Sequence, residues 1–72
     1  MIEVFKTNVQ SEEDAQLILR DYSALFPGWK IGFDLDDCDK ILRIDSGKDT
    51  ILIPEIQNII QKFGFTADLL QN

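Results

Sequence analysis

Residues 29–44 read WKIGFDLDDCDKILRI, and this stretch decides the fold. From Trp29 to Leu35 every second residue is apolar, which predicts a strand with one face in the core. Asp36 to Asp39 is rich in turn-forming residues, and the apolar run from Ile41 to Ile44 follows it. The stretch therefore predicts a β-hairpin.

The residues before this hairpin predict a strand and a helix. Ile2 to Thr7 is rich in β-branched and aromatic residues, as strands are. Ser11 followed by Asp14 resembles a capping box, which marks the start of a helix, and Pro27-Gly28 ends it. Between these signals the apolar residues have helical spacing: Ala15, Ile18, Leu19, Tyr22, Leu25 and Phe26.

The residues after the hairpin predict a second helix and a last strand. Ser46 to Asp49 has the composition of a loop. Thr50 to Ile53 is compatible with a strand or with the approach to a helix, and Pro54 favours a helix start because proline suits a first helical position. Gly64 is placed as a left-handed C-terminal cap, and Phe65 to Leu70 predicts a short strand. The apolar stripe of this helix is Ile56, Ile59, Ile60 and Phe63.

The predicted order is strand, helix, strand, strand, helix, strand, which is the split βαβ arrangement. Right-handed crossovers place both helices on one face of a four-stranded antiparallel sheet. A chain of 72 residues builds one hydrophobic core. We therefore expect a single α+β domain over residues 1–72, a ferredoxin-like βαββαβ sandwich.

The second face of this sheet is expected to stay uncovered. Because side chains alternate along a strand, an inward orientation of Val4, Leu42 and Ile44 sends their neighbours outward. The uncovered face then carries three residues that are candidates for an interaction surface: Phe5, Ile41 and Arg43.

The composition excludes some partners and predicts a compartment. Thirteen acidic and seven basic residues give a net charge of −6, which repels nucleic-acid backbones and anionic lipids. No stretch approaches the roughly 20 apolar residues of a membrane span, and the N-terminus does not resemble a signal peptide. A single cysteine, Cys38, suits a reducing compartment. We expect a cytoplasmic protein that binds neither nucleic acid nor membrane.

Three short motifs resemble the heavy-metal-associated (HMA) domain, the ferredoxin-like module of copper chaperones and metal-transporting ATPases. They are Phe26-Pro27-Gly28-Trp29, Ile53-Pro54-Glu55 and Phe63-Gly64-Phe65-Thr66-Ala67. The resemblance covers nearly the whole chain and implies the HMA-like fold.

This chain lacks the cysteines of that family's metal-binding loop. HMA domains hold soft metal with a Met-x-Cys-x-x-Cys loop between the first strand and the first helix, because two thiolates suit Cu(I) or zinc. Counting from the first strand puts the two cysteines at Ser11 and Asp14, and counting back from Pro27-Gly28 puts them at Glu12 and Ala15. Neither register contains a cysteine, so the resemblance implies the fold without the metal activity, and we expect no cofactor.

The acidic turn of the hairpin offers the remaining metal ligands: Cys38, Asp36, Asp37 and Asp39. A helix-loop-helix calcium site counted from Asp34 needs glycine at its sixth position and glutamate at its twelfth, where this chain has Asp39 and Asp45. The main interpretation is a solvated hairpin tip, and weak divalent-ion binding is the alternative. A metal shared between the Cys38 residues of two chains is a further alternative.

The sequence offers few of the side chains that enzymes use for catalysis. The chain contains no histidine, so the commonest general base is absent, and neither Cys38 nor the serines have a base nearby in sequence. We expect a non-enzymatic module that binds a second copy or another protein through its open sheet face or edge. The alternatives are a divergent metal-binding protein and a small-molecule-binding regulatory domain.

Overall fold

The computed structural model describes residues 1–70. Its elements follow the predicted order strand, helix, strand, strand, helix, strand. Their bounds are β1 Ile2–Thr7, α1 Glu12–Leu25, β2 Lys30–Asp34, β3 Ile41–Asp45, α2 Ile53–Gln61 and β4 Ala67–Leu69.

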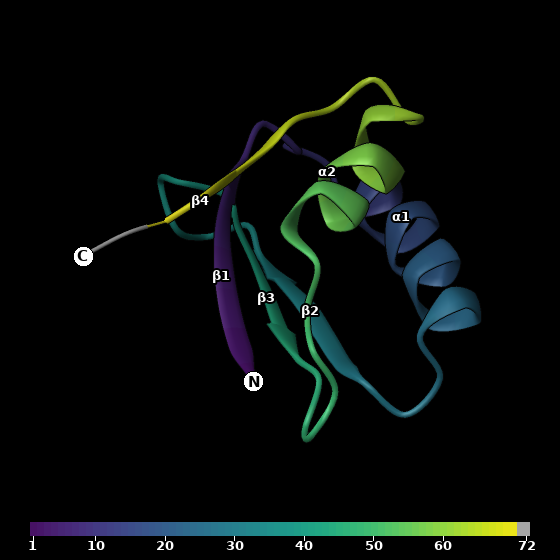
Figure 1. The fold of residues 1–72 in the computed structure, drawn as a ribbon. Coiled ribbons are helices and arrows are strands. Elements are labelled where there is room, and N and C mark those ends of the chain that lie inside the picture. The colour runs from purple at the N-terminus through teal and green to yellow at the C-terminus, as the bar shows by residue number, and fades with distance from the viewer. Residues whose placement is uncertain (71–72) are drawn as a thin grey trace.

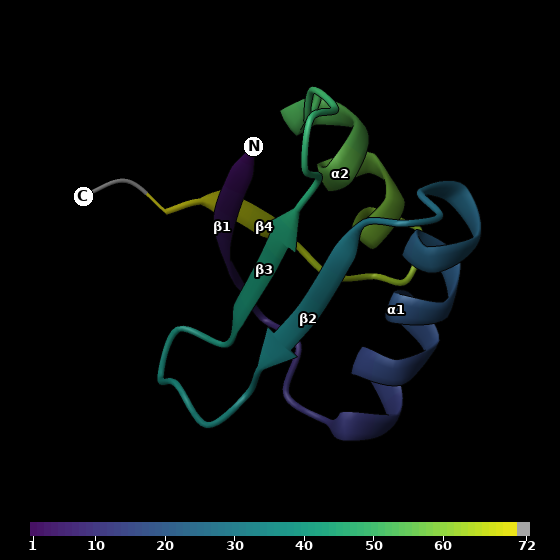
Figure 2. The same cartoon turned by 90° about the horizontal axis from the view of Figure 1, so that it is seen from below.

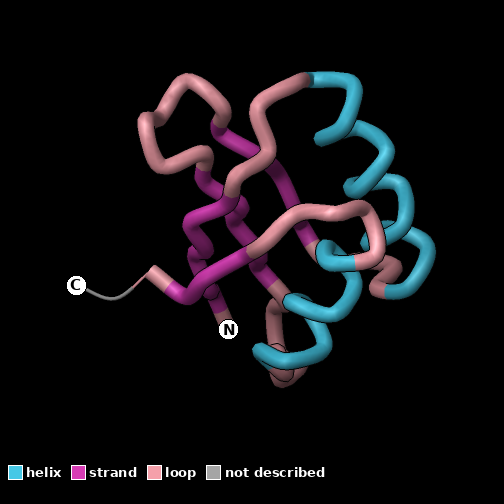
Figure 3. The backbone as a smooth tube through the Cα atoms, turned by 90° about the horizontal axis from the view of Figure 1, so that it is seen from above, coloured by secondary structure: helices cyan, strands magenta, loops and turns pink. Residues whose placement is uncertain are grey.

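The six elements form two layers. The strands make one antiparallel sheet in the order β2-β3-β1-β4. Both helices lie on one side of this sheet, as the ribbon and tube views show (Figures 1, 2 and 3). The fold is therefore the ferredoxin-like α+β sandwich that the sequence predicts. Within residues 1–70 the other face of the sheet has no second layer of secondary structure.

Helix α1 begins where the capping signal places it. The Ser11 side chain accepts a hydrogen bond of 3.1 Å from the backbone N–H of Asp14, which satisfies one of the free donors of the first turn. At the other end the Phe26 N–H bonds the Tyr22 carbonyl at 2.8 Å. Leu25, which the helical spacing placed in the apolar stripe, is 54% exposed. The sequence therefore predicted the helix correctly, but it wrongly included Leu25 among the residues of the apolar stripe.

Helix α2 resolves the ambiguous segment at Thr50 to Ile53. The segment forms no strand, Ile51 is buried, and the helix begins at Ile53 with Pro54 in its first turn. Proline fits there because the first N–H groups of a helix have no intrahelical partner. Gly64 follows the helix with a φ of 86°, the left-handed conformation that its position predicted.

Strand β4 is shorter than predicted. It covers Ala67–Leu69, whereas the sequence predicted a strand from Phe65. The backbone donors before it bond elsewhere, because Phe65 donates to the Ile60 carbonyl and Thr66 donates to the Asn8 side chain at 2.8 Å. These bonds satisfy the backbone donors of Phe65 and Thr66, so the pairing of β4 with β1 begins only at Ala67.

The core lies between the sheet and the helices, and one buried hydrogen bond joins the helices across it. The Tyr22 hydroxyl donates to the Ile56 carbonyl at 2.8 Å. This bond links α1 to the first turns of α2 and satisfies a polar group that would be costly to bury alone. The buried apolar residues are Phe5, Val9, Ala15, Ile18, Tyr22, Leu42, Ile44, Ile51, Ile56, Ile59, Ile60 and Ala67.

The predicted orientation of β1 is wrong. Phe5 is fully buried, and it pairs with Leu42 on the core face. Val4 pairs with Arg43 and therefore lies on the uncovered face. The two residues are adjacent and both apolar, so alternation alone does not fix which one points inward. Burying the aromatic ring removes more apolar surface from water, which favours the observed orientation.

The new orientation predicts unequal costs for two apolar truncations on the same strand. We expect Phe5→Ala to lower the free energy of unfolding by about 3–5 kcal/mol, because it leaves a cavity in the core. Ile2→Ala, at a residue that is 52% exposed, should cost less than about 1 kcal/mol. Urea unfolding followed by circular dichroism measures both, and equal costs would contradict the inward position of Phe5.

The Tyr22 bond predicts a stability loss that depends on pH. Tyr22→Phe removes the hydrogen bond to the Ile56 carbonyl and should cost about 0.5–1.5 kcal/mol at neutral pH. Burial raises the pKa of the Tyr22 hydroxyl above its ordinary value, so folding favours the protonated form. The wild type therefore keeps this contribution in full below pH about 10, the pKa of an unfolded tyrosine, and loses it as the pH rises further.

The comparison of the two proteins isolates this contribution. The difference in unfolding free energy between wild type and Tyr22→Phe should shrink above pH about 10, because only the wild type has the group that titrates. Tyr22 is the single tyrosine of the chain, so the absorbance of tyrosinate follows its ionisation directly. A difference that stays constant into the alkaline range would contradict the buried position.

Candidate interaction surface on the sheet

The pairing register defines the side chains on the uncovered sheet face, because residues that pair across an antiparallel ladder share a face. The structure places Ile41 and Arg43 on this face and Phe5 in the core. From β1, β3 and β2 the residues that share it are Ile2, Val4, Lys6, Ile41, Arg43, Asp45, Lys30, Gly32 and Asp34.

One half of this face, over β1 and β4, carries three apolar side chains next to the charged pair Lys6 and Asp68. Ile2 is 52% exposed and Val4 is half-buried. Leu70 donates its backbone N–H to the Val4 carbonyl at 2.8 Å and so continues the β1–β4 ladder by one residue. Its side chain is also exposed. These three side chains form an apolar strip beside the last strand.

The other half of the face, over β2 and β3, is charged and hollowed. Lys30 lies opposite Asp45, and Gly32 lies opposite Arg43. A depression of about 410 Å³ opens above them, lined also by Asp34. A side chain at Gly32 would meet nothing within 4 Å, so the lack of one leaves this space open.

One backbone hydrogen bond shows which residues of β3 direct their N–H and C=O groups toward β1. We call this alternation the hydrogen-bond phase of the sheet. The Thr7 N–H bonds the Lys40 carbonyl at 3.2 Å, one step beyond the end of the β1–β3 ladder. Hydrogen-bonded pairs recur at every second residue of an antiparallel ladder. Counted from Lys40, the backbone groups of Leu42 and Ile44 therefore point toward β1.

The same phase determines which backbone groups of β2 are free. Arg43 lies between the β3 residues that bond β1, so its N–H and C=O point toward β2, where it pairs with Gly32. The backbone groups of Ile31 and Phe33, one residue to each side, therefore point away from the sheet. Because β2 is an edge strand, these groups have no strand partner within residues 1–70.

Of the features that protect natural sheet edges, β2 has charged residues at its two ends, Lys30 and Asp34. It lacks three others, which are proline, bulges and charges that point inward. β2 has no proline, pairs continuously with β3 over its five residues, and carries the apolar Ile31 and Phe33 on its core side. At the opposite edge, β4 has three residues. The β2 edge is the longer and the better suited of the two to accept another strand.

An aromatic stack holds the start of β2 in place. The ring of Trp29 stacks on Phe26 with centroids 4.2 Å apart and planes at 10°. The Trp29 indole N–H donates to Asp49 Oδ2 at 2.8 Å, in the loop after β3. These contacts tie the strand to both neighbouring loops, so the edge is presented by a well-anchored segment.

The hairpin tip brings three of the four predicted metal ligands together. One ligand atom each from Asp37, Cys38 and Asp39 lies within 4.8 Å of the others, whereas Asp36 is not in this group. Cys38 is exposed. The sequence therefore predicted the position of this cluster, and its hydrogen bonds decide whether the ligand atoms are free.

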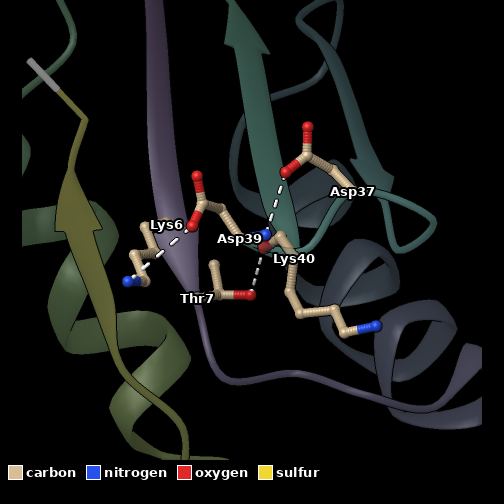
Figure 4. Close-up of polar contacts among 5 residues, drawn as sticks. All are labelled: Lys6, Thr7, Asp37, Asp39 and Lys40. Carbon is tan, nitrogen blue, oxygen red and sulfur yellow. Dashed lines mark hydrogen bonds and ion pairs between the residues drawn. The ribbon is translucent and has the colours of Figure 1, made fainter. Parts of the chain in front are cut away.

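The two carboxylates already serve the turn (Figure 4). Asp37 Oδ1 accepts the Asp39 backbone N–H at 2.9 Å, and Asp39 Oδ1 lies 3.7 Å from the ammonium of Lys6. The Lys40 carbonyl accepts the Thr7 hydroxyl at 2.6 Å, which fastens the tip to β1. Aspartate is common in turns for this kind of local bonding. Asp37 therefore has a local role in the turn, and Asp39 forms an exposed ion pair with Lys6 on β1.

Two features of the surface go beyond what the sequence predicted. The sequence predicted association through the open sheet face or edge without identifying which edge, and a lone glycine inside a strand pattern, Gly32, is the signal that points to β2. The second feature is a groove between the helices that exposes Leu25 and Leu52, which are 54% and 58% accessible. Its signal is Leu52 itself, an apolar residue that immediately precedes the first turn of α2.

The occupied carboxylates lead to a prediction about metal. We expect wild type and Cys38→Ser to bind zinc equally and weakly, because Asp37 bonds within the turn, Asp39 pairs with Lys6, and a lone thiol makes a poor site. Zinc titration by calorimetry on protein prepared without chelators compares the two. Tight binding that is lost in Cys38→Ser would contradict this and would support a metal centre at the tip.

None of the helices in residues 1–70 is both long and apolar enough to cross a membrane. In comparisons with known proteins, no family model, curated protein or solved structure matches the chain. The resemblance to HMA domains therefore rests on the sequence motifs, and the functional argument rests on the surface of the sheet.

Proposed function

We propose that this chain is a non-enzymatic interaction module that associates with itself through its β-sheet. The observation that carries the proposal is the β2 edge, where the backbone groups of Ile31 and Phe33 point outward and have no strand partner in the part of the chain that the structure describes. Exposed strand edges bind other strands through main-chain hydrogen bonds. The uncovered face beside this edge leaves room for a second chain.

The burial of the edge residues supports association. Ile31 and Phe33 point to the core side of the sheet, yet both remain only half-buried because no strand within residues 1–70 lies on the outer side of β2. A partner strand would cover more of their apolar surface. A chain of 72 residues buries a smaller share of its surface than a larger domain does, so it gains stability from such contacts.

The side chains that could act in catalysis support a role without it. The sequence has no histidine. The Tyr22 hydroxyl lies in the core and bonds the Ile56 carbonyl, so its raised pKa reflects structure. The Asp37 carboxylate bonds within the hairpin turn, and the Asp39 carboxylate pairs with Lys6 on β1. These contacts give the tyrosine and the two carboxylates structural roles.

The net charge sets a condition on the interface. Two chains of net charge −6 repel each other at long range, and this repulsion is screened at physiological ionic strength beyond roughly 8 Å. Self-association therefore requires local complementarity at the contact. The mixed charges over β2 and β3, with Lys30 and Arg43 beside Asp34 and Asp45, supply both signs at the edge.

The oligomeric state tests the proposal. We expect sedimentation velocity to show a mass that rises with concentration from 8.3 kDa toward twice that value. Leu52→Glu, at an exposed position in the helical layer, should leave this behaviour unchanged. A mass of one chain at every concentration up to the millimolar range would refute self-association.

Native mass spectrometry of freshly purified protein separates this proposal from its alternatives. A mass of two bare chains agrees with self-association. An added mass of bound metal would favour the hairpin tip, and a retained organic ligand would favour the depression above Gly32.

A further inference from the structure

We propose that two copies pair through their β2 strands, antiparallel and centred on Gly32, to form one continuous eight-stranded sheet. This inference rests on the proposed self-association and names the contact that produces it. Four observations carry it: the free backbone groups, the charges at the strand ends, the lone glycine and the half-buried apolar side chains.

The free backbone groups fit this register. An antiparallel pair centred on Gly32 places Ile31 opposite the partner's Phe33, and the symmetry repeats the pair. Ile31 and Phe33 are the residues whose N–H and C=O point outward, so each pair exchanges two hydrogen bonds. Gly32 itself bonds β3, and its pairing with the partner's Gly32 is of the type without direct hydrogen bonds.

The charges at the ends of β2 are complementary in the same register. The strand reads KIGFD, with a lysine at one end and an aspartate at the other. Reversal of the second strand places Lys30 opposite the partner's Asp34, and the two-fold axis repeats this pair. Both side chains lie on the uncovered face, in pairs of the type where Cα atoms are about 4.5 Å apart and side chains are closest.

Other arrangements lose this match. Parallel pairing in register would place Lys30 opposite the partner's Lys30, and like charges directly opposite destabilise a sheet. An antiparallel shift by two residues in one direction would leave Lys30 opposite the partner's Gly32. A shift in the other direction would leave Asp34 opposite the partner's Gly32 and would place Lys30 opposite the partner's Asp36, which lies beyond the end of β2. The register centred on Gly32 is therefore the one that pairs all four end charges and all four outward-facing residues.

Gly32 is explained by the pairing and not by the isolated fold. Its φ lies outside the left-handed region that favours glycine, and a Cβ there would meet nothing within 4 Å. Glycine weakens a strand interior and often marks the close approach of another backbone. At the two-fold axis it faces the partner's Gly32, so the depressions of both copies join into one hollow bordered by Arg43 of each chain.

The core side of the new sheet completes the contact. Ile31 and Phe33 are half-buried at the edge of the apolar layer. In the proposed register Ile31 lies beside the partner's Phe33, and Phe33 lies beside the partner's Ile31. Each pair places an aliphatic side chain next to an aromatic ring. Such cross-strand pairs stabilise sheets. The apolar layer under β2 then continues from one chain into the next.

Charge reversal tests the register. Lys30→Asp places two acidic side chains opposite each other, and Asp34→Lys places two lysines opposite each other, each twice per dimer. We expect each single variant to weaken the dissociation constant of the dimer by roughly tenfold or more. An equimolar mixture of the two variants should form a heterodimer with wild-type affinity, because every acid then faces a lysine. The double variant Lys30→Asp/Asp34→Lys should again form a homodimer.

A matched control separates the effect of the Lys30–Asp34 pairs between the two chains from the effect of a change in net charge. Lys6→Asp changes the net charge by the same amount as Lys30→Asp and lies on the same sheet face, on the central strand β1. It should leave the dissociation constant within roughly threefold of wild type. Thermal unfolding of each variant shows that it is folded. Sedimentation velocity measures dimerisation in all of them.

A cysteine placed on the two-fold axis gives a second readout that does not depend on charge. In a Cys38→Ser background, Gly32→Cys brings two thiols into the range of Cα separations, about 4.4–6.8 Å, that a disulfide spans. Mild oxidation should cross-link this variant rapidly, while Lys6→Cys in the same background should not cross-link.

The outcomes distinguish the register from the proposed function. A wild-type dimer whose affinity is unchanged in both charge variants, or whose Gly32→Cys form does not cross-link, overturns pairing at β2 and leaves self-association standing. A wild type that stays monomeric overturns both. Rescue in the mixture together with selective cross-linking at position 32 supports the proposed pair.

Discussion

The pairing of Phe5 with Leu42 in the middle of the sheet is the contact on which the other surfaces depend. It points the aromatic ring into the core and so fixes which residues of β1 and β3 face outward. A slip of one residue would exchange the two faces of the sheet. The same pairing sets the hydrogen-bond phase that passes through Arg43 to Gly32 and directs the backbone of Ile31 away from the sheet.

Local signals predicted the order of elements, because each of them acts over a few residues. Ser11 caps α1, Pro54 lies in the first turn of α2 and Gly64 closes it, as their chemistry requires. The orientation of β1 could not be predicted, since Val4 and Phe5 are adjacent apolar residues and only the partner strand distinguishes them. For the same reason the sequence placed one of its three surface candidates in the wrong layer.

The candidate site shows the same division between local and long-range information. The clustering of acids and thiol at the hairpin tip follows from adjacency in sequence and was predicted. The engagement of Asp37 and Asp39 by the backbone and by Lys6 depends on the folded turn. The edge at β2 depends on strand order, which no short stretch encodes. The sequence therefore predicted a solvated hairpin tip, with metal binding as an alternative, and association through the sheet face or edge, and the geometry adds which edge strand has outward-facing backbone groups.

The position of β4 has a consequence for how the chain is made. β1 is a central strand, and one of its two neighbours is formed by residues 67–69, more than sixty residues later in the chain. During synthesis that side of β1 stays unpaired until residues 67–69 have been made. The nascent protein therefore has a temporary open edge at β1, next to the hydrophobic core. Docking of β4 removes this edge, so β4 is the element that protects the interior of the sheet.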